Sequence, residues 1–256
     1  MSQEVIVAVE AALQAGKILR ERVDDIGKVS FKEFHDPVTE VDHLAEKAII
    51  TRIKKTFPDH DILAEESGNA EGSDSTSKWI IDPLDGTLNY SHGYPCYCVS
   101  IALEQEGEVK VGVIYNPFSD EIFYAQKNKG AFLNGNQIKI SNTENIQNAS
   151  IIVSRSEYSK NLWNNYKNNF SSIKSVGSIA YKLGLSASGM YDICATVAPK
   201  NEWDICAGDC IVREAGGTMK TINGKNINYN QKKTLVTDPI IATNSKLFDM
   251  VSDLLY

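Results

Sequence analysis

The amino-acid sequence predicts an α/β protein in which an α+β half precedes an α/β half. Two helical patterns open the chain, and strand-like segments then follow one another without an intervening helix to about residue 140. Beyond residue 148, strand-like and helix-like segments alternate, which is the pattern of an α/β unit. We place the boundary in the polar segment SNTENIQNAS, which divides the chain into residues 1–145 and 146–256.

Each helix of the first half has its own signal. Residues 3–22 place apolar side chains among charged ones at a helical period, and these are Ile6, Val9, Leu13 and Ile18. A second helix is expected from Thr39, because Pro37 disfavours helix before it and TEVD has the order of a capping box. Its expected apolar positions are Leu44, Ala45 and Ile49. It ends before Phe57, which precedes a proline.

The remaining elements follow in order. The expected strands of the first half are DILAEE, KWIID, CYCVSIALEQ, EVKVGVIY, EIFYAQ and AFLNG. Turn signals at Glu106-Gly107 and Asn134-Gly135-Asn136 indicate hairpins, so we expect an antiparallel meander. The second half is expected to contain strand SIIVS, a helix at 157–167, a strand near 172–175, a helix at 179–188, a short strand, a helix at 204–215, a strand and a helix at 245–254.

Composition limits the possible functions. The 256 residues carry a net charge of −7 and contain no long block of lysine or arginine, which argues against binding a nucleic-acid polymer. No apolar run reaches the roughly 18 residues of a membrane span, and the N-terminus lacks the plan of a signal peptide. We therefore expect a cytoplasmic protein without membrane contact. Five scattered cysteines are expected to be reduced thiols, not disulfides or zinc ligands.

Acidic residues stand at the ends of three expected elements. Asp82 and Asp85 follow the strand KWII, Glu65 and Glu66 end the strand before it, and Asp204 opens a helix. Each cluster has a structural explanation: Asp-Pro and Asp-Gly are common turn pairs, paired glutamates suit a solvated loop, and an aspartate can cap a helix. Asp42 also has a structural explanation, which is that it does no more than complete its capping box.

Chemistry gives a reason for these groups to converge. Hard divalent cations need several oxygen ligands, and a pair of Mg²⁺ ions held by carboxylates stabilises both oxygens of a phosphoryl displacement. The carbonyl of Leu84 is a further oxygen ligand, and Gly86 and Thr87 open a short segment whose N–H groups are suited to a phosphate. Bound cations would offset the cost of burying Asp82 and Asp85.

The segments VTEVD, EES, DPLDGTLNY and WDICAG occur in this order along the chain. They resemble the motifs of the inositol-monophosphatase superfamily of metal-dependent, lithium-sensitive phosphatases. The resemblance runs from Val38 to about Gly217 and includes GVIYNP and GAFLNG. It implies a layered αβαβα sugar-phosphatase architecture, a cofactor of two to three Mg²⁺ ions, a small phosphorylated substrate and, by analogy with relatives, a homodimer.

The resemblance also implies roles for individual residues. The ligands of one Mg²⁺ would be Glu65, Asp82 and the Leu84 carbonyl, and those of a second would be Asp82, Asp85 and Asp204. A third, weaker ion would use Glu65 and water. Thr87, hydrogen-bonded to Asp42, would orient and help deprotonate the attacking water, with Glu66 close by. The expected substrate-binding residues are Gly86, Thr87, Ser154, Gly177, Ser178, Ala180, Lys200 and Asn201.

The sequence indicates two substrate classes. LNYSHGYP and VGSIA resemble the inositol branch of the superfamily. The loop GMYDICATVAPKNEWD resembles the longer loop of the bisphosphate-nucleotidase branch, and it has no acid matching the glutamate that inositol phosphatases direct at a ring hydroxyl. Lys200 and Asn201 are suited either to a second phosphate or base, or to a solvated loop.

We therefore expect an inositol-1-monophosphatase-like, Mg²⁺-dependent phosphomonoesterase. The alternatives are a 3′(2′),5′-bisphosphate nucleotidase acting on adenosine 3′,5′-bisphosphate and a fructose-1,6-bisphosphatase activity. A third alternative is a catalytically retired binding partner, since some relatives are partners of the transcription machinery. The complete set of expected ligand residues favours an enzyme.

Overall fold

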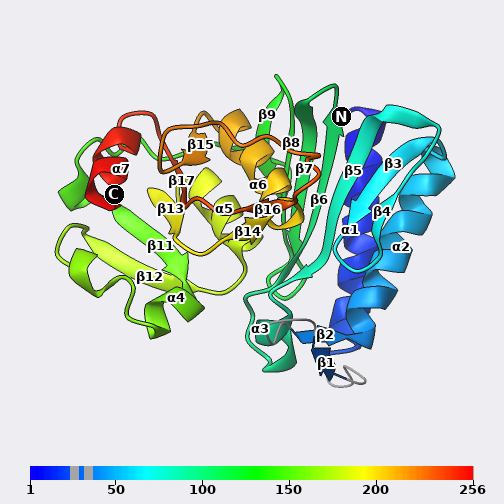
Figure 1. Ribbon diagram of the computed structural model, residues 1–256, viewed down its shortest axis with the longest axis horizontal. Coiled ribbons are helices and arrows are strands. Elements are labelled where there is room, and N and C mark those ends of the chain that lie inside the picture. Colours follow the sequence, from blue (N-terminus) through cyan, green and yellow to red (C-terminus); the bar gives the residue numbers. More distant parts are fainter. Residues whose placement is uncertain (24–28, 32–36, 256) are drawn as a thin grey trace.

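The computed structural model describes residues 1–23, 29–31 and 37–255, and its elements form five layers in the order helix, sheet, helix, sheet, helix (Figure 1). Two N-terminal helices cover the outer face of a large sheet, two further helices lie between it and a smaller sheet, and the last helix covers the smaller sheet. These helices are α1 (Gln3–Glu21), α2 (Glu40–Thr56), α5 (Ile179–Ala187), α6 (Glu202–Glu214) and α7 (Phe248–Leu255). The predicted fold class and layered architecture are confirmed.

The large sheet contains the six strands expected in the first half and two short ones that were not expected. In spatial order its strands are β10 (Asn136–Ile138), β9 (Gly130–Leu133), β8 (Glu121–Gln126), β7 (Glu108–Asn116), β6 (Cys98–Gln105), β5 (Asp74–Asp85), β3 (His60–Ala64) and β4 (Gly68–Ala70). The expectation of a purely antiparallel meander was wrong, because β3 and β5 pair in parallel. The short strand β4 folds back on the outer side of β3, so the chain returns to the inner side as β5.

The smaller sheet contains both parallel and antiparallel pairs. Its strands in spatial order are β12 (Ser172–Val176), β11 (Ser150–Ser154), β13 (Ile193–Thr196), β17 (Ile240–Thr243) and β15 (Thr218–Thr221). β11 runs parallel to both of its neighbours, while β17 pairs antiparallel with β13 and β15. Two ribbons, each of two strands, complete the described strands: β1 (Val29–Phe31) with β2 (Pro37–Thr39), and β14 (Lys200–Asn201) with β16 (Leu235–Val236).

The helix expected at 157–167 is not continuous. The chain forms α4 (Arg155–Ser159) and then the 3₁₀ turn η3 (Asn164–Tyr166). Asn161 adopts a left-handed conformation with φ of 61°, which an α-helix does not accommodate. The other predicted helices are present within a few residues of their expected ends. None of the described helices is long and apolar enough to span a bilayer.

Three apolar cores lie between the layers. In the core formed by α1, α2 and the large sheet, α1 buries a different face from the one expected. Ile6 and Leu13 are each 41% exposed, whereas a ridge of small residues is buried. Gly16 lies so close to the sheet that a Cβ there would be 2.3 Å from the ring of Tyr115. α1 therefore packs through small side chains, which a search for large apolar residues does not detect. In α2, Leu44 is also exposed.

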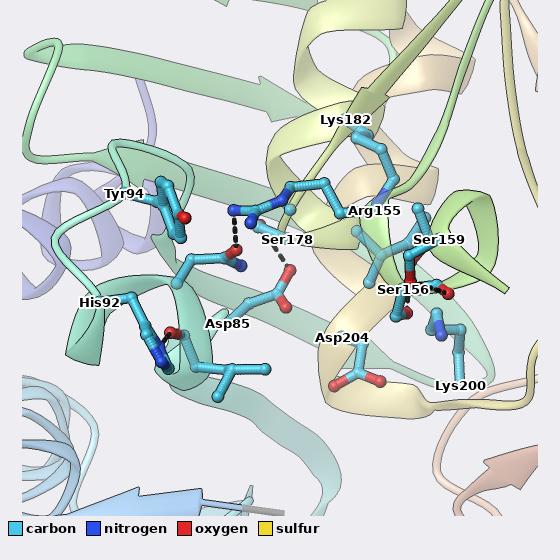
Figure 2. A pocket seen from close by; sticks show the side chains of 15 residues that line it. Asp85, His92, Tyr94, Arg155, Ser156, Ser159, Ser178, Lys182, Lys200 and Asp204 are labelled. Atoms are coloured by element: carbon cyan, nitrogen blue, oxygen red, sulfur yellow. Dashed lines mark hydrogen bonds between the residues drawn. The ribbon is translucent and has the colours of Figure 1, made fainter.

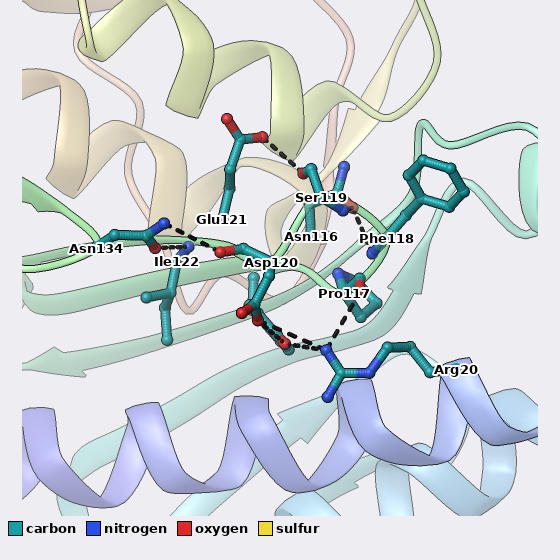
Figure 3. A network of polar contacts seen from close by, with 10 residues as sticks. Arg20, Asn116, Pro117, Phe118, Ser119, Asp120, Glu121, Ile122 and Asn134 are labelled. Atoms are coloured by element: carbon teal, nitrogen blue, oxygen red, sulfur yellow. Dashed lines mark hydrogen bonds and ion pairs between the residues drawn. The ribbon is translucent and has the colours of Figure 1, made fainter.

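The turn between β7 and β8 is fixed by polar contacts to α1 (Figure 3). Arg20 donates to the Tyr115 hydroxyl at 2.6 Å, and that hydroxyl donates to Asp120 at 2.6 Å. Asn134 donates to the carbonyl of Asp120, which ties in the next hairpin. Because Tyr181 of α5 donates to Glu121 at 2.6 Å, the same turn also supports the middle helical layer.

All five cysteines are free thiols, and four of them are buried, as the sequence indicated. Cys206 and Cys210 both lie on α6 in the middle core, while Cys98 faces the same core from β6. Burial raises the pKa of each of these three thiols. They are therefore poor nucleophiles at neutral pH, and they act as packing residues.

Candidate active site

A bulge in β5 brings Asp82 and Asp85 to the same face of the large sheet. Asp82 pairs with Ser100 and Asp85 with Cys98, so three steps along β5 match two steps along β6. The extra residue falls at Pro83-Leu84, where proline has no N–H to give to the ladder. Side chains alternate along a strand, and without the bulge two residues three apart would face opposite sides. Both aspartates therefore face the middle layer.

This face adjoins a cavity of about 560 Å³ between the two halves of the chain (Figure 2). Six of the predicted site residues line it: Asp85, Ser154, Gly177, Ser178, Lys200 and Asp204. The sequence did not single out Asn89, Tyr94, Arg155 and Lys182, which also line it. The cavity is thus assembled from the end of β5, the segment after it, the ends of β11 and β12, α4, β14 and the starts of α5 and α6.

The carboxylates beside this cavity lie close enough to repel one another. Burial raises the pKa of Asp82 well above its ordinary value, and the charges of Glu65, Asp85 and Asp204 raise it further. A hydrogen bond between Asp82 and Glu65 has the same effect. The pKa of Asp204 is raised by burial and then by Asp85 and Glu65. The four acids expected from the sequence to bind metal therefore form one electrostatic cluster.

Local donors hold one oxygen of each aspartate in the cluster. Asp85 Oδ2 accepts from the Ser178 hydroxyl and from the N–H of Ala180, each at 2.7 Å. Asp82 Oδ1 accepts from the N–H of Leu84 at 2.9 Å, and Asp204 Oδ2 accepts from the N–H of Asn201 at 2.9 Å. Ser178 and Ala180, expected to bind substrate, thus contact a carboxylate directly.

The chemistry of this donor set fits Mg²⁺. All four acids and the Leu84 carbonyl offer hard oxygen ligands, and the partial compensation of Asp85 by the charges of Lys182 and Lys200 leaves the cluster acidic. Among the described residues, no three histidine, cysteine or acidic side chains are arranged around one point as a ready-made ion site.

Thr87 and Asp42 form the contact that the resemblance implied. The Thr87 hydroxyl lies 3.0 Å from Asp42 Oδ1 and 3.1 Å from the carbonyl oxygen of Leu84. The other oxygen of Asp42 accepts from the N–H and the hydroxyl of Thr39, at 2.8 and 2.6 Å, and completes the capping box of α2. Asp42 therefore has both roles: one carboxylate oxygen caps α2, and the other contacts Thr87.

Gly86 is required by the backbone at the start of α3 (Thr87–Ser91). Its φ is 101°, a conformation that residues with a Cβ rarely adopt, and a Cβ there would lie 2.9 Å from the carbonyl oxygen of Cys96. Gly177 is tight for a different reason, since a Cβ would lie 2.1 Å from Asn89 Nδ2. These two glycines bring the segment after β5 close to the end of β12.

Several predicted residues do not line the cavity. Asn201 contacts Thr234 through its side-chain oxygen and Asp204 through its N–H, so it caps α6. The N–H of Glu66 donates to Glu46, a buried acid that the sequence analysis missed. His92, which was not among the predicted site residues, does line the cavity: it is exposed at the rim, where its ring contacts the carbonyl oxygen of Leu88. Two of the missed lining residues had a signal in the sequence. Arg155 follows directly after a strand, and Lys182 is the lone charge of α5.

Comparison with known proteins identifies the family. A sequence profile described as "Inositol monophosphatase family" matches residues 1–253. "Nus factor SuhB" of Pasteurella multocida is 37% identical over 88% of this chain and 87% of its own, and "Fructose-1,6-bisphosphatase/inositol-1-monophosphatase" of Aquifex aeolicus is 36% identical over 96% and 92%. The solved inositol monophosphatase of Anabaena superposes with a TM-score of 0.84 at 32% identity, covering 98% of this chain and 94% of that one. The chain belongs to the inositol monophosphatase family.

Proposed function

We propose that the protein is a Mg²⁺-dependent phosphomonoesterase that hydrolyses inositol monophosphate or a similar small phosphate ester. The observation that carries this proposal is the hydroxyl of Thr87, which contacts both Asp42 and the carbonyl oxygen of Leu84. A packing role alone gives no reason to place several buried and half-buried carboxylates together beside one cavity, where each raises the free energy of the others. The family membership supports the same reaction class.

In this proposal the ions are held by Glu65, Asp82, Asp85, Asp204 and the carbonyl of Leu84. Bound Mg²⁺ supplies charge neutralisation for the phosphate and a lower pKa for water. Thr87 accepts a hydrogen bond from the attacking water and passes its own hydroxyl proton towards Asp42, which the backbone N–H of Thr39 orients. Ser178 and the N–H of Ala180 keep Asp85 in place during the reaction.

The test is phosphate release from inositol 1-phosphate by the purified chain with Mg²⁺, with excess EDTA, and in the variant Asp85→Asn. We expect turnover only in the wild type with Mg²⁺, and a loss of about 10²-fold or more in kcat for the variant. Asp249→Asn is the matched control, because Asp249 is exposed on α7. Unchanged turnover in EDTA, or in Asp85→Asn, would contradict the proposal.

A binding role without catalysis is the second candidate, because one relative carries the name of a Nus factor. The two candidates differ in one outcome. A retired enzyme would leave inositol 1-phosphate, adenosine 3′,5′-bisphosphate and fructose 1,6-bisphosphate all intact under conditions in which the folded protein binds Mg²⁺. The presence of every expected ligand residue favours the enzyme. A homodimer, lithium sensitivity, a cytoplasmic location and the division into halves at 145/146 stay predictions.

A further inference from the structure

The segment 197–204 (the arm) joins the smaller sheet to α6 and carries Lys200 and Asp204 into the cavity. The arm has little regular structure of its own, because β14 has only two residues and α6 begins at Glu202. Pro199 is exposed and the residues on either side of it are half-buried, so apolar packing contributes little at this point. The position of the arm therefore depends largely on its polar contacts.

Glu157 holds the first part of the arm. It is 2% exposed and lies on α4, which also lines the cavity. Its Oε1 accepts from the N–H groups of Val197 and Ala198, at 3.1 and 3.0 Å, and from the Thr196 hydroxyl. Its Oε2 accepts from the Trp163 indole at 3.0 Å, which fixes the plane of the carboxylate. One buried carboxylate thus joins two walls of the cavity, α4 and the arm.

Glu202 holds the second part of the arm against the segment that contains β16. It is 1% exposed, and its two oxygens accept from the N–H groups of Asn230 and Gln231, at 2.6 and 2.9 Å. The N–H of Glu202 donates to the carbonyl oxygen of Thr234 at 2.9 Å, and β14 pairs with β16 beside it. The side chain of Asn230 also donates to Glu104 of β6 at 3.0 Å. The start of α6 is thereby connected to the large sheet.

Neither glutamate takes part in the site directly. Neither lines the cavity, and within the described part of the chain neither forms a salt bridge. A buried carboxylate without a cation is unfavourable unless several donors compensate it, and packing alone would be served by an apolar side chain. Hydrogen bonds from N–H groups to a carboxylate are strong and directional, so each glutamate fixes the backbone that it contacts.

We propose that Glu157 and Glu202 are positioning residues of the active site: Glu157 fixes the cavity wall at Lys200, and Glu202 fixes Asp204 against the other carboxylates. The inference rests on the proposed function, in which Asp204 holds an ion. Both glutamates act through the arm. A looser first part of the arm therefore weakens the hold on the substrate, and a looser second part weakens Mg²⁺ binding.

The test uses Glu157→Gln and Glu202→Gln, which keep the size of the side chain but place an NH₂ donor where an oxygen accepted. We expect Glu202→Gln to weaken Mg²⁺ binding by about tenfold in a calorimetric titration of the substrate-free protein. Glu157→Gln should keep its Mg²⁺ affinity within about twofold of the wild type and raise KM for inositol 1-phosphate by about tenfold, with kcat little changed. A general loss of structure would not separate these two constants.

Glu214→Gln is the matched control. Glu214 also accepts three backbone N–H groups, those of residues 128–130, but it lies at the far end of α6. This variant should lose stability in urea unfolding and keep the Mg²⁺ affinity and KM of the wild type. The inference is overturned if Glu214→Gln changes both constants as much as the test variants do, or if the test variants leave both constants unchanged.

Two milder variants serve if the glutamine variants do not fold. Asn230→Gly retains the left-handed backbone, with φ of 60°, and the N–H donated to Glu202, but it removes the bond to Glu104. It should weaken Mg²⁺ binding by about threefold, the effect of one modest hydrogen bond. Thr196→Val removes one of the donors to Glu157 and should raise KM by about threefold. Unchanged constants in both variants would contradict the inference.

The proposed function and this inference fail in different ways. If the wild type binds Mg²⁺ but does not hydrolyse inositol 1-phosphate, the proposed function fails. The inference is then decided by calorimetric titration of inositol 1-phosphate in Mg²⁺: weaker binding to Glu157→Gln than to Glu214→Gln supports it, and equal or absent binding overturns it. If the wild type turns over with Mg²⁺ and Glu202→Gln keeps its Mg²⁺ affinity, the proposed function stands and the inference is wrong.

Discussion

Two aspartates of the site each serve a helix cap and the candidate active site at once. Asp42 and Asp204 both occupy the third position of a capping box, in α2 and α6. One oxygen of each accepts a backbone N–H at the helix start, while the second oxygen of Asp42 accepts from Thr87. The cap fixes the rotamer of the carboxylate, so its free oxygen is positioned without further support.

The two functions of Asp42 can be separated by substitution. Thr39→Val removes a cap hydroxyl and should lower the free energy of unfolding by about 1 kcal/mol with little change in kcat. Thr87→Ala should do the reverse: kcat falls by about 10²-fold while KM stays within a few-fold. Asp42→Asn should lose both stability and rate. The measurements are urea unfolding and steady-state kinetics on inositol 1-phosphate, with Thr87→Ser as the variant that restores a hydroxyl. If Asp42→Asn kept a normal kcat, Asp42 would have only its helix-capping role and no role in catalysis.

Gly86 tests whether the segment after β5 must keep its backbone conformation. Gly86→Ala places a Cβ at 2.9 Å from a carbonyl oxygen in a left-handed conformation, so the segment carrying Thr87 has to shift. We expect kcat/KM to fall by at least about tenfold, since small misplacements at a reacting centre have large effects. Gly107→Ala is the control: Gly107 is also left-handed, but no atom lies within 4 Å of its Cβ position. Equal losses of activity in both variants would argue against a local effect.

At this scale the sequence singled out the acids that the structure brings together, but it did not single out Arg155 and Lys182. Asp82, Asp85 and Asp204 stood out because charge at the end of an apolar segment is unusual. Lys182 lies within an apolar helix, where a single lysine normally extends its charge to solvent. Only the packing of α5 between two sheets makes it buried. The sequence also presented capping and site roles as alternatives, because spacing does not reveal that one carboxylate has two directed oxygens.

At the scale of elements, hairpins could be predicted from the sequence, but pairings between strands that no hairpin joins could not. Glu106-Gly107 and Asn134-Gly135 form the hairpin turns that the sequence indicated, and all four residues have positive φ. The parallel pairing of β3 with β5 depends on the short strand β4, whose sequence GNA has no apolar pattern. The bulge at Pro83-Leu84 was likewise hidden, because Asp-Pro also suits a simple turn. Yet that bulge is what turns both aspartates to one face.

Asp192 connects three elements and makes stability depend on pH. It accepts from the hydroxyls of Thr143 and Ser150 and from the N–H of Ser150, at 2.6, 2.7 and 2.7 Å. Burial alone would raise its pKa, but these bonds and one from Ser141 outweigh burial and hold the pKa below the ordinary 3.8. A carboxyl with a lowered pKa stabilises the folded state above the unfolded-state value, and this contribution disappears as the pH falls through the folded-state value.

We therefore expect Asp192→Asn to be less stable than the wild type at neutral pH, and the difference to shrink in acid. The measurement is urea unfolding of both proteins at about pH 7, 5 and 3. The difference should be similar at the two higher values and smaller at the lowest. Asp249→Asn, on the exposed side of α7, should show no such trend. A difference that stays constant down to about pH 3 would mean that the carboxylate charge is not what stabilises this junction.

At the scale of the whole molecule, the five layers place the acidic cluster where the middle helical layer meets the large sheet. The middle core takes residues from both sheets and both middle helices, so the two halves of the chain share it. Its edge carries Asp82, Asp85 and Asp204, whose mutual repulsion works against folding. We therefore expect this repulsion to destabilise the folded state at the junction of the two halves until cations bind.

This expectation can be measured on the intact protein. Mg²⁺ should raise the melting temperature of the wild type, because an ion bound only by the folded state adds its binding free energy to stability. In EDTA, Asp85→Asn should melt higher than the wild type by about 2 °C or more, which corresponds to roughly 1 kcal/mol for a chain of this size. The amide retains an oxygen for Ser178 and Ala180, so the variant removes charge without removing an acceptor. Its response to Mg²⁺ should be smaller than that of the wild type, whereas Asp249→Asn should respond as the wild type does. An Asp85→Asn protein that melts lower in EDTA and gains as much from Mg²⁺ would show that the cluster neither strains the fold nor holds the ion.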